Sequence, residues 1–123
     1  MNRRELTHKN ALLTLDMIAE GEQPIDDYLK RGDTDQADMF RRGLSKCDGV
    51  VKRSPHQDAK AIDKYLCTVG VIDGQEAILV NWEWNPDKAK YWHDVWVNKY
   101  GGKPMVHWPG KDGKEVYDYP HFE

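Results

Sequence analysis

The side chains best suited to acid–base chemistry in this sequence are its histidines and Glu83. Hydrolysis of a phosphodiester needs a general base, a general acid and a cation near the scissile phosphate. The spacing of the histidines and Glu83 matches no catalytic motif, so we predict no catalytic residue. The candidates that supply the right chemical groups are Glu83 or His93 as base, His107 or His56 as acid, and Lys52 or Arg53 as cation.

A small basic group lies in and beside the polar stretch of residues 50–58, VVKRSPHQD, where Pro55 excludes a regular helix. Such a loop has the chemistry to contact phosphate. The net charge of −3 argues against a general nucleic-acid binder, which normally has a basic domain or stripe. A solvated surface loop explains the same residues without any ligand. The candidate phosphate-contacting residues are Lys52, Arg53, His56 and Lys60.

The sequence contains no motif for a metal, a cofactor or a reactive thiol. Ligand types are present at Glu83, His93, Asp94, His107 and His121, but no CxxC, HxxxH or HExxH spacing occurs. Two cysteines, at positions 47 and 67, are too few for a disulfide framework. We therefore expect no metal, no cofactor, and a cytoplasmic protein with free thiols.

The aromatic residues are unevenly distributed, with all five Trp between positions 82 and 108. We interpret Tyr91 to Tyr100 as a strand because it is rich in Val, Tyr and Trp. Residues of one parity share a face of a strand, and the opposite face carries Val95 and Val97, which suit a core. The even-numbered face of this strand combines large aromatic residues with polar ones: Trp92, Asp94, Trp96, Asn98 and Tyr100.

This aromatic-acidic face is the predicted binding surface. Asp94 and Asn98 would be costly to bury without partners, so their side should meet solvent or a polar partner. Trp and Tyr are enriched at the hot spots of protein interfaces, and they also suit stacking with a base or sugar. Trp82 and Trp84 share a face of the preceding strand and extend the candidate surface. The alternative is that these Trp residues complete a core in a protein with few Leu and Phe.

The elements that must position these residues begin with three helices. Apolar residues recur at helical spacing from Arg4 to Glu20, and Gly21 is a natural stop. A short second helix should begin at Pro24 and end at Gly32. A third helix should follow an N-cap at Asp33 and run to about residue 46. The predicted helical part is therefore residues 1–48.

The second part of the chain, residues 59–120, reads as an antiparallel meander of about five strands. Lys64 to Ile72 and Gln75 to Trp84 flank Asp73-Gly74, a strong hairpin signal. After Tyr91 to Tyr100, the remaining strands are Lys103 to Trp108 and Glu115 to Tyr119. We predict an α+β fold in which about three N-terminal helices pack on one face of this sheet.

Length and composition are consistent with a single soluble domain spanning residues 1–123. The apolar fraction is 39% and the charged fraction 32%, and no apolar run approaches the length of a membrane span. Helices followed by an antiparallel sheet also make the order of elements similar to that of small bacterial ribonucleases of barnase-like and RelE-like architecture. This resemblance is one of layout only and covers no motif.

Three functions remain open from sequence. A short acidic domain without catalytic motifs favours a protein that covers a protein partner, as immunity proteins and phage-encoded inhibitors do. An endoribonuclease-like enzyme would use the Lys/Arg/His loop, although such enzymes are usually basic. A nucleotide or other small ligand would bind through the Trp cluster. The sequence leaves the partner and the oligomeric state open.

Overall fold

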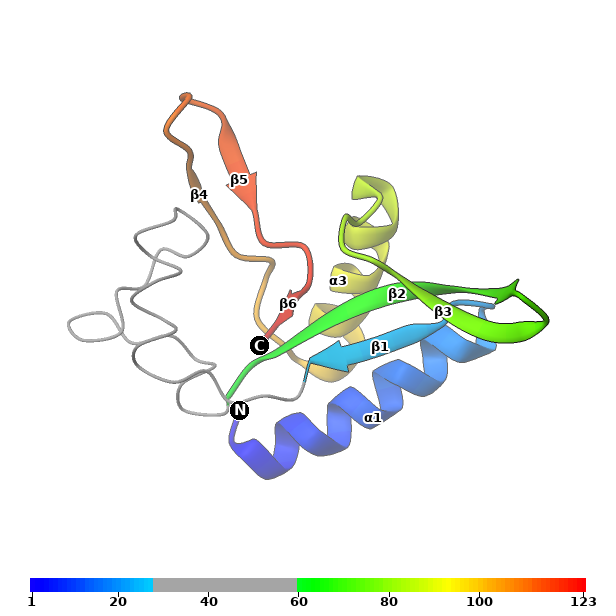
Figure 1. Cartoon of the computed structure of the whole chain (residues 1–123). Coiled ribbons are helices and arrows are strands. Elements are labelled where there is room, and N and C mark those ends of the chain that lie inside the picture. Colours follow the sequence, from blue (N-terminus) through cyan, green and yellow to red (C-terminus); the bar gives the residue numbers. More distant parts are fainter. Residues whose placement is uncertain (28–59) are drawn as a thin grey trace.

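The computed structural model describes residues 1–27 and 60–123 of the chain (Figure 1). The described part is α+β with antiparallel sheets, as the sequence predicts. The predicted third helix and the connection at residues 50–58 lie outside the described residues. In chain order the elements are α1 Arg3–Ala19, β1 Pro24–Asp27, β2 Ile62–Ile72, β3 Gln75–Asn81, α3 Pro86–Tyr100, β4 His107–Pro109, β5 Glu115–Tyr117 and β6 His121–Phe122.

Helix α1 confirms the first predicted helix. Asn2 is its N-cap, and the side-chain oxygen of Asn2 accepts a hydrogen bond of 2.9 Å from the backbone N–H of Glu5. The helix ends at Ala19 with Glu20 as its C-cap, and Gly21 follows with a φ of 89°, in the left-handed region that favours glycine. Its buried side chains form one stripe at helical spacing: Leu6, Asn10, Leu13 and Met17.

The second predicted helix is wrong where the structure describes it, because Pro24–Asp27 form strand β1. This strand pairs antiparallel with β2, placing Asp26 directly opposite Lys64. Burial alternates along β1, which is the strand period, and not the helical one. The acidic residues that resemble a helix N-terminus instead serve a cross-strand contact, so tertiary context overrides the local signal.

The hairpin of β2 and β3 confirms the strongest local prediction. Asp73 and Gly74 have φ values of 53° and 77°, both in the left-handed region that a two-residue hairpin turn requires. The register runs without interruption from Leu66 opposite Asn81 to Ile72 opposite Gln75. Strand β1 pairs with the other edge of β2, and β6 pairs with its first residues, giving a four-stranded sheet.

The predicted strand from Tyr91 to Tyr100 is wrong, because these residues belong to helix α3. The side chain of Asn85 caps the helix by accepting hydrogen bonds from two backbone N–H groups, and Pro86 occupies the first turn. Gly101 ends it with a φ of 71°. Burial of Ala89, Trp92, His93, Trp96 and Tyr100 follows the helical period.

The remaining strands do not continue a meander. Short strands β4 and β5 form a separate two-stranded sheet. β4 overlaps only the end of the strand predicted from Lys103 to Trp108, and β5 lies within the strand predicted from Glu115 to Tyr119. The sequence does not predict β6, which returns to pair with the start of β2. Figure 1 shows the β4–β5 ribbon standing away from the larger sheet.

The core is an aromatic cluster centred on Phe122. The Phe122 ring stacks on the His93 ring, with 4.1 Å between centroids, and meets Trp96 edge-on at 5.9 Å. The Trp84 ring also packs against Phe122, with 6.2 Å between the two ring centroids. Because Phe122 belongs to β6, Trp84 to the segment after β3, and the other two to α3, this packing joins three parts of the chain.

A buried ion pair lies under α1. The Nζ of Lys64, which is fully buried, donates to Asp26 Oδ1 at 2.5 Å and to Thr14 Oγ1 at 2.8 Å. Asn10 Nδ2 donates to the second oxygen of the same carboxylate at 2.8 Å. Burial lowers the pKa of Lys64, and the Asp26 carboxylate opposes this change. The pair thus attaches α1, β1 and β2 to one another.

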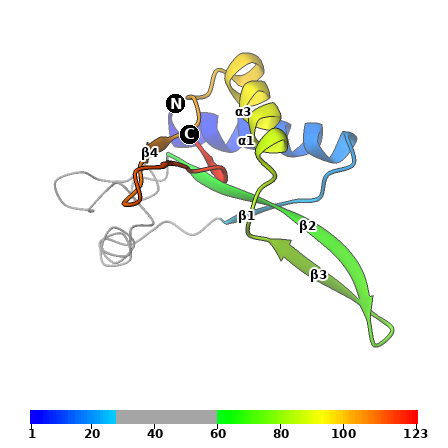
Figure 2. The same ribbon diagram turned by 90° about the horizontal axis from the view of Figure 1, so that it is seen from above.

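Both helices lie on the same side of the larger sheet, and the hairpin extends past them (Figure 2). Burial along β2 decreases from its start to its turn: Ile62 and Lys64 are buried, while Val71 and Ile72 are exposed. The core therefore covers one end of the sheet, and none of the elements described packs over the distal half of the hairpin. We call residues 67–80 the hairpin arm.

We predict that Phe122→Ala destabilises the protein by about 3–5 kcal/mol, since it removes a fully buried aromatic ring and leaves a cavity. Urea unfolding measures the difference. Val71→Ala, at an exposed position, should change the free energy of unfolding by no more than about 0.5 kcal/mol. Equal losses in the two variants would contradict the placement of Phe122 in the core.

We predict that Asp26→Ala destabilises the protein by about 3–5 kcal/mol, because it leaves the Lys64 ammonium buried without its carboxylate. The double variant Asp26→Leu/Lys64→Met removes both charges and should lose less stability than the single variant. Chemical denaturation of both proteins provides the comparison. If the double variant is less stable than Asp26→Ala, the unpaired charge of Lys64 is not the cause of the stability lost in Asp26→Ala.

Candidate protein-binding surface

The residues predicted to form an aromatic-acidic face do not share one. Trp92, Trp96 and Tyr100 are buried on the inner side of α3, in the core. Asp94 and Asn98 are exposed on α3, where Asp94 pairs with Lys90 one turn earlier. The predicted face depended on a strand, and the helix separates its aromatic members from its polar ones.

The two Trp residues nearest the hairpin have different environments. Trp84 is buried, and its Nε1 donates a hydrogen bond of 2.9 Å to the backbone oxygen of Lys64. Trp82 is 70% exposed and packs its ring against Tyr65, edge to face, at 4.9 Å. Of the seven predicted partner-binding residues, Trp82 is the large aromatic residue that remains available to a partner.

The candidates for phosphate chemistry are not assembled in the described part of the chain. Lys52, Arg53 and His56 lie outside the described residues, and Lys60 is exposed. Glu83 is exposed, whereas His93 is buried and its Nε2 donates to the backbone oxygen of Tyr119 at 2.7 Å. Burial lowers the pKa of His93 and favours its neutral form.

His107 makes a local contact on the smaller sheet. Its Nδ1 lies 2.5 Å from Glu115 Oε1 on the neighbouring strand, and both side chains are partly exposed. A cross-strand pair of this kind links β4 and β5. It involves neither of the other described candidates, Glu83 and His93.

The outer side of the larger sheet carries a contiguous apolar surface. Cross-strand pairing places Ile25 beside Tyr65, Cys67 beside Val80, and Val69 beside Ile78, with all six side chains on the side opposite Lys64. None of the described elements packs over this side, since α1 and α3 occupy the other (Figure 2). We call the following set the outer face: Ile25, Tyr65, Cys67, Val69, Val71, Ile78, Val80 and Trp82.

Several members of the outer face are too exposed to contribute to the core. Val71 is 75% exposed and Ile78 is 63% exposed. Single exposed apolar residues are common on proteins, but a contiguous group marks a place of contact. The Tyr65–Trp82 pair adds flat aromatic area with polar edges at one end of the outer face.

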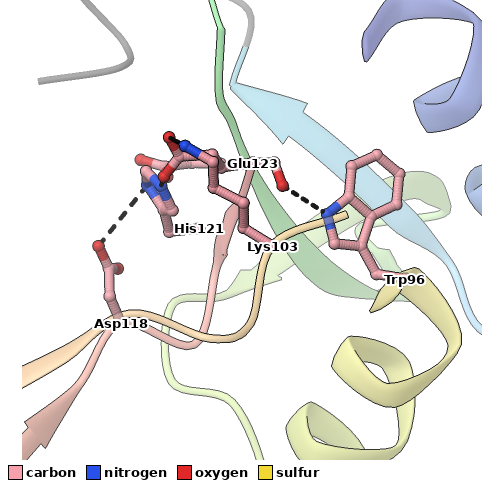
Figure 3. A network of polar contacts seen from close by, with 6 residues as sticks. Trp96, Lys103, Asp118, His121 and Glu123 are labelled. Carbon is pink, nitrogen blue, oxygen red and sulfur yellow. Dashed lines mark hydrogen bonds and ion pairs between the residues drawn. The ribbon is translucent and has the colours of Figure 1, made fainter. Parts of the chain in front are cut away.

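A polar network holds the end of the described chain against α3 (Figure 3). The backbone oxygen of Glu123 accepts hydrogen bonds from Trp96 Nε1 at 3.0 Å and from the Lys103 N–H at 2.7 Å. The Glu123 carboxylate contacts His121 Nε2 at 3.2 Å and Lys103 Nζ at 3.1 Å. Asp118 lies 3.8 Å from His121 Nδ1.

This network positions β6 and, through it, Phe122. The hydrogen bond with His121, and then the contact with Lys103, lower the pKa of Glu123 from 4.5 to about 2. His121 has carboxylates near it, but within residues 1–27 and 60–123 no group of three His, Cys, Asp or Glu side chains has the geometry to hold a metal ion. We interpret the contacts of this network as structural, because they hold β6, and with it Phe122, against the core.

No helix in the described part of the chain has the length and apolar character needed to cross a membrane. Comparison of the chain with protein-family models, with curated proteins and with solved structures finds no match. The function is therefore argued from the geometry of this molecule.

The sequence contains a signal for the outer face in the hairpin itself. Apolar residues occur at both parities of the hairpin, in TVGVI before the turn and AILV after it. A sheet with one covered face should alternate between apolar and polar residues. Apolar residues on both faces of a sheet whose helices can cover only one side predict a second contact surface.

We predict that the protein loses stability as the pH falls from about 4.5 to about 2, through protonation of Glu123. Because its folded-state pKa lies below the usual value, the carboxylate stabilises the fold fully above pH 4.5, and this contribution disappears below pH 2. The shift corresponds to at most about 3 kcal/mol.

Unfolding of the Glu123→Gln variant, measured between pH 7 and pH 2, tests this assignment. The variant should be less stable than the natural protein at pH 7, and the difference should shrink as the pH falls. Glu76→Gln, at an exposed position, is the matched control. A pH dependence that is the same with and without Glu123 would refute the role of this carboxylate.

Proposed function

We propose that this protein binds a protein partner and acts by covering it, in the manner of an inhibitor or immunity protein. The supporting observation is the outer face, an apolar sheet surface that no described element covers. Burial of a large apolar side chain contributes roughly 1.5–3 kcal/mol, so the residues of the outer face together offset part of the free-energy cost of association. The proposed contact surface differs from the aromatic-acidic face expected from sequence.

The shape of the hairpin arm favours a macromolecular partner over a small ligand. Sites for small molecules are concave and enclose most of the ligand. The hairpin arm instead extends beyond the helices and presents its outer side openly (Figures 1 and 2). An open sheet surface with exposed aliphatic residues fits the core of a protein interface, where charged residues are depleted.

Trp82 is the proposed anchor of the interface. It combines large area with high exposure, and its contact with Tyr65 limits the motion of the ring. Few residues dominate the affinity of most interfaces, and Trp and Tyr are prominent among them. The same side of the sheet carries carboxylates at its two ends, since Glu76 lies opposite Val71 and Asp27 lies opposite Asp63. The proposed contact therefore depends on the apolar centre of the outer face, with the charged residues at its rim.

We predict that Trp82→Ser weakens partner binding by about 2 kcal/mol or more, roughly 30-fold in Kd. Its effect on the free energy of unfolding should stay below about 1 kcal/mol, because the side chain is largely exposed. Immobilised natural protein and variant are used to capture proteins from the source cell, and the Kd of each captured protein is then measured by calorimetry.

The matched control is Leu15→Ser, which removes an exposed apolar residue of α1 away from the outer face. It should retain the proteins that the natural chain captures. Capture of the same proteins with the same affinity by the Trp82 variant would exclude the outer face as the binding surface.

A further inference from the structure

Strand β3 has one edge without a described partner. Its seven residues, QEAILVN, pair with β2 along the other edge, and no strand within the described residues occupies the second. Figure 1 shows β3 at the border of the sheet, in the hairpin arm. An edge of this kind presents backbone N–H and C=O groups to any strand that approaches.

The sequence of β3 lacks most of the features that usually protect an edge strand, and its one charged residue, Glu76, lies near one end. Natural edges are blocked by Lys, by Pro, by a bulge or by a very short strand. β3 contains neither Lys nor Pro, and its unbroken register with β2 shows no bulge. Its centre is the apolar run Ala77–Val80, whose high β-propensity favours pairing.

We propose that a second copy of this chain adds its own β3 to this edge, antiparallel, so that two copies share one continuous sheet. The two-fold axis passes through Ile78. This inference does not depend on the proposed function, because it concerns the edge of the sheet and a different occupant.

The sequence of β3 is complementary to itself in this register. Ile78 meets Ile78 of the other copy, Ala77 lies opposite the larger Leu79, and at the ends the amides of Gln75 and Asn81 lie opposite each other. The charged residue, Glu76, lies opposite Val80. The two Glu76 side chains are offset by four positions, or roughly 13 Å, so no like charges face each other.

Exposure along the hairpin arm also agrees with this occupant. Ile78 and Leu79 point to opposite faces, and both are more than half exposed. A strand added beside β3 would partly cover both Ile78 and Leu79. A partner that binds one face of the sheet would cover only one of them. One position beyond the strand, Trp82 falls opposite Gly74 in the turn of the other copy, where the space beside Gly74 is open.

Charge substitution at the two-fold position tests the register. Ile78→Lys and Ile78→Glu each place like charges directly opposite each other, and each should weaken dimerisation at least about tenfold. An equimolar mixture of the two variants pairs Lys with Glu and should restore a dimer. Sedimentation velocity over a range of concentrations measures all three, with Leu15→Lys on α1 as a control that stays dimeric.

Cross-linking gives a second readout that does not rely on charge. In a chain carrying Cys47→Ser and Cys67→Ser, Ile78→Cys should form a disulfide between two copies on mild oxidation, because facing residues of an antiparallel pair have suitable Cα separations. Val71→Cys, on β2, should not form this cross-link. Far-UV circular dichroism establishes that each variant is folded.

Two results would overturn the proposal. One is a natural protein that remains monomeric up to about 0.5 mM, a concentration at which even weak strand pairing would be visible. The other is a dimer that neither Ile78 variant weakens. A monomer that still captures a partner through Trp82 would overturn this inference alone and leave the proposed function in place.

Discussion

Packing around Phe122 is the interaction on which the rest of the structure depends. This one ring contacts His93 and Trp96 of α3 as well as Trp84 after β3. The ring reaches that position because β6 pairs with the first residues of β2. Trp84 in turn donates to the backbone of Lys64, so the aromatic cluster also fixes the inner side of β2. Removing the Phe122 ring would remove these contacts between α3, β6 and the segment after β3.

The position of this cluster explains why an apolar surface is left open. The core covers Ile62, Lys64 and Leu66 at one end of β2, while the strand continues to Ile72. Apolar residues of the hairpin arm therefore cannot be buried by the same cluster. A protein that retains such residues at exposed positions either uses them for contact or carries an aggregation risk. The two proposed contacts, on a face and along an edge, are the two ways in which a sheet can be covered.

Sequence reasoning succeeded where local signals and tertiary packing agree. The Gly21 stop after α1 and the Asp73-Gly74 turn are local features, and all three residues have the positive φ that such positions need. It failed between Tyr91 and Tyr100 because Trp92, Trp96 and Tyr100 are spaced by four, which places them on one face of a strand and of a helix alike. The aromatic and β-branched residues favoured a strand. The Asn85-Pro86 cap was the signal that should have decided for a helix.

The other differences arise from contacts that are distant in the sequence. Nothing local to His121-Phe122 predicts a strand, since only two residues pair and their partner lies some sixty residues earlier. β1 reads as a helix start because it has Pro followed by two acidic residues, and its strand form depends on Lys64 far along the chain. The prediction that Trp92, Asp94, Trp96, Asn98 and Tyr100 share one surface was wrong for a related reason. The predicted exposure of Trp92 and Trp96 assumed a strand from Tyr91 to Tyr100, and these residues form part of helix α3.

The buried ion pair connects the stability of the fold to the position of the outer face. Side chains of a strand alternate between its faces, so moving β2 by one residue would turn Lys64 outward and Tyr65 inward. Such a move would break the bonds of Lys64 to Asp26 and Thr14 and bury the Asp26 carboxylate beside an aromatic ring. A wholly apolar β2, with Val and Ile at both parities, would discriminate poorly between the two registers. The charge on the inner side therefore specifies which apolar side chains point outward, and the orientation of Trp82, Ile78 and Val71 follows from a contact on the opposite side of the sheet.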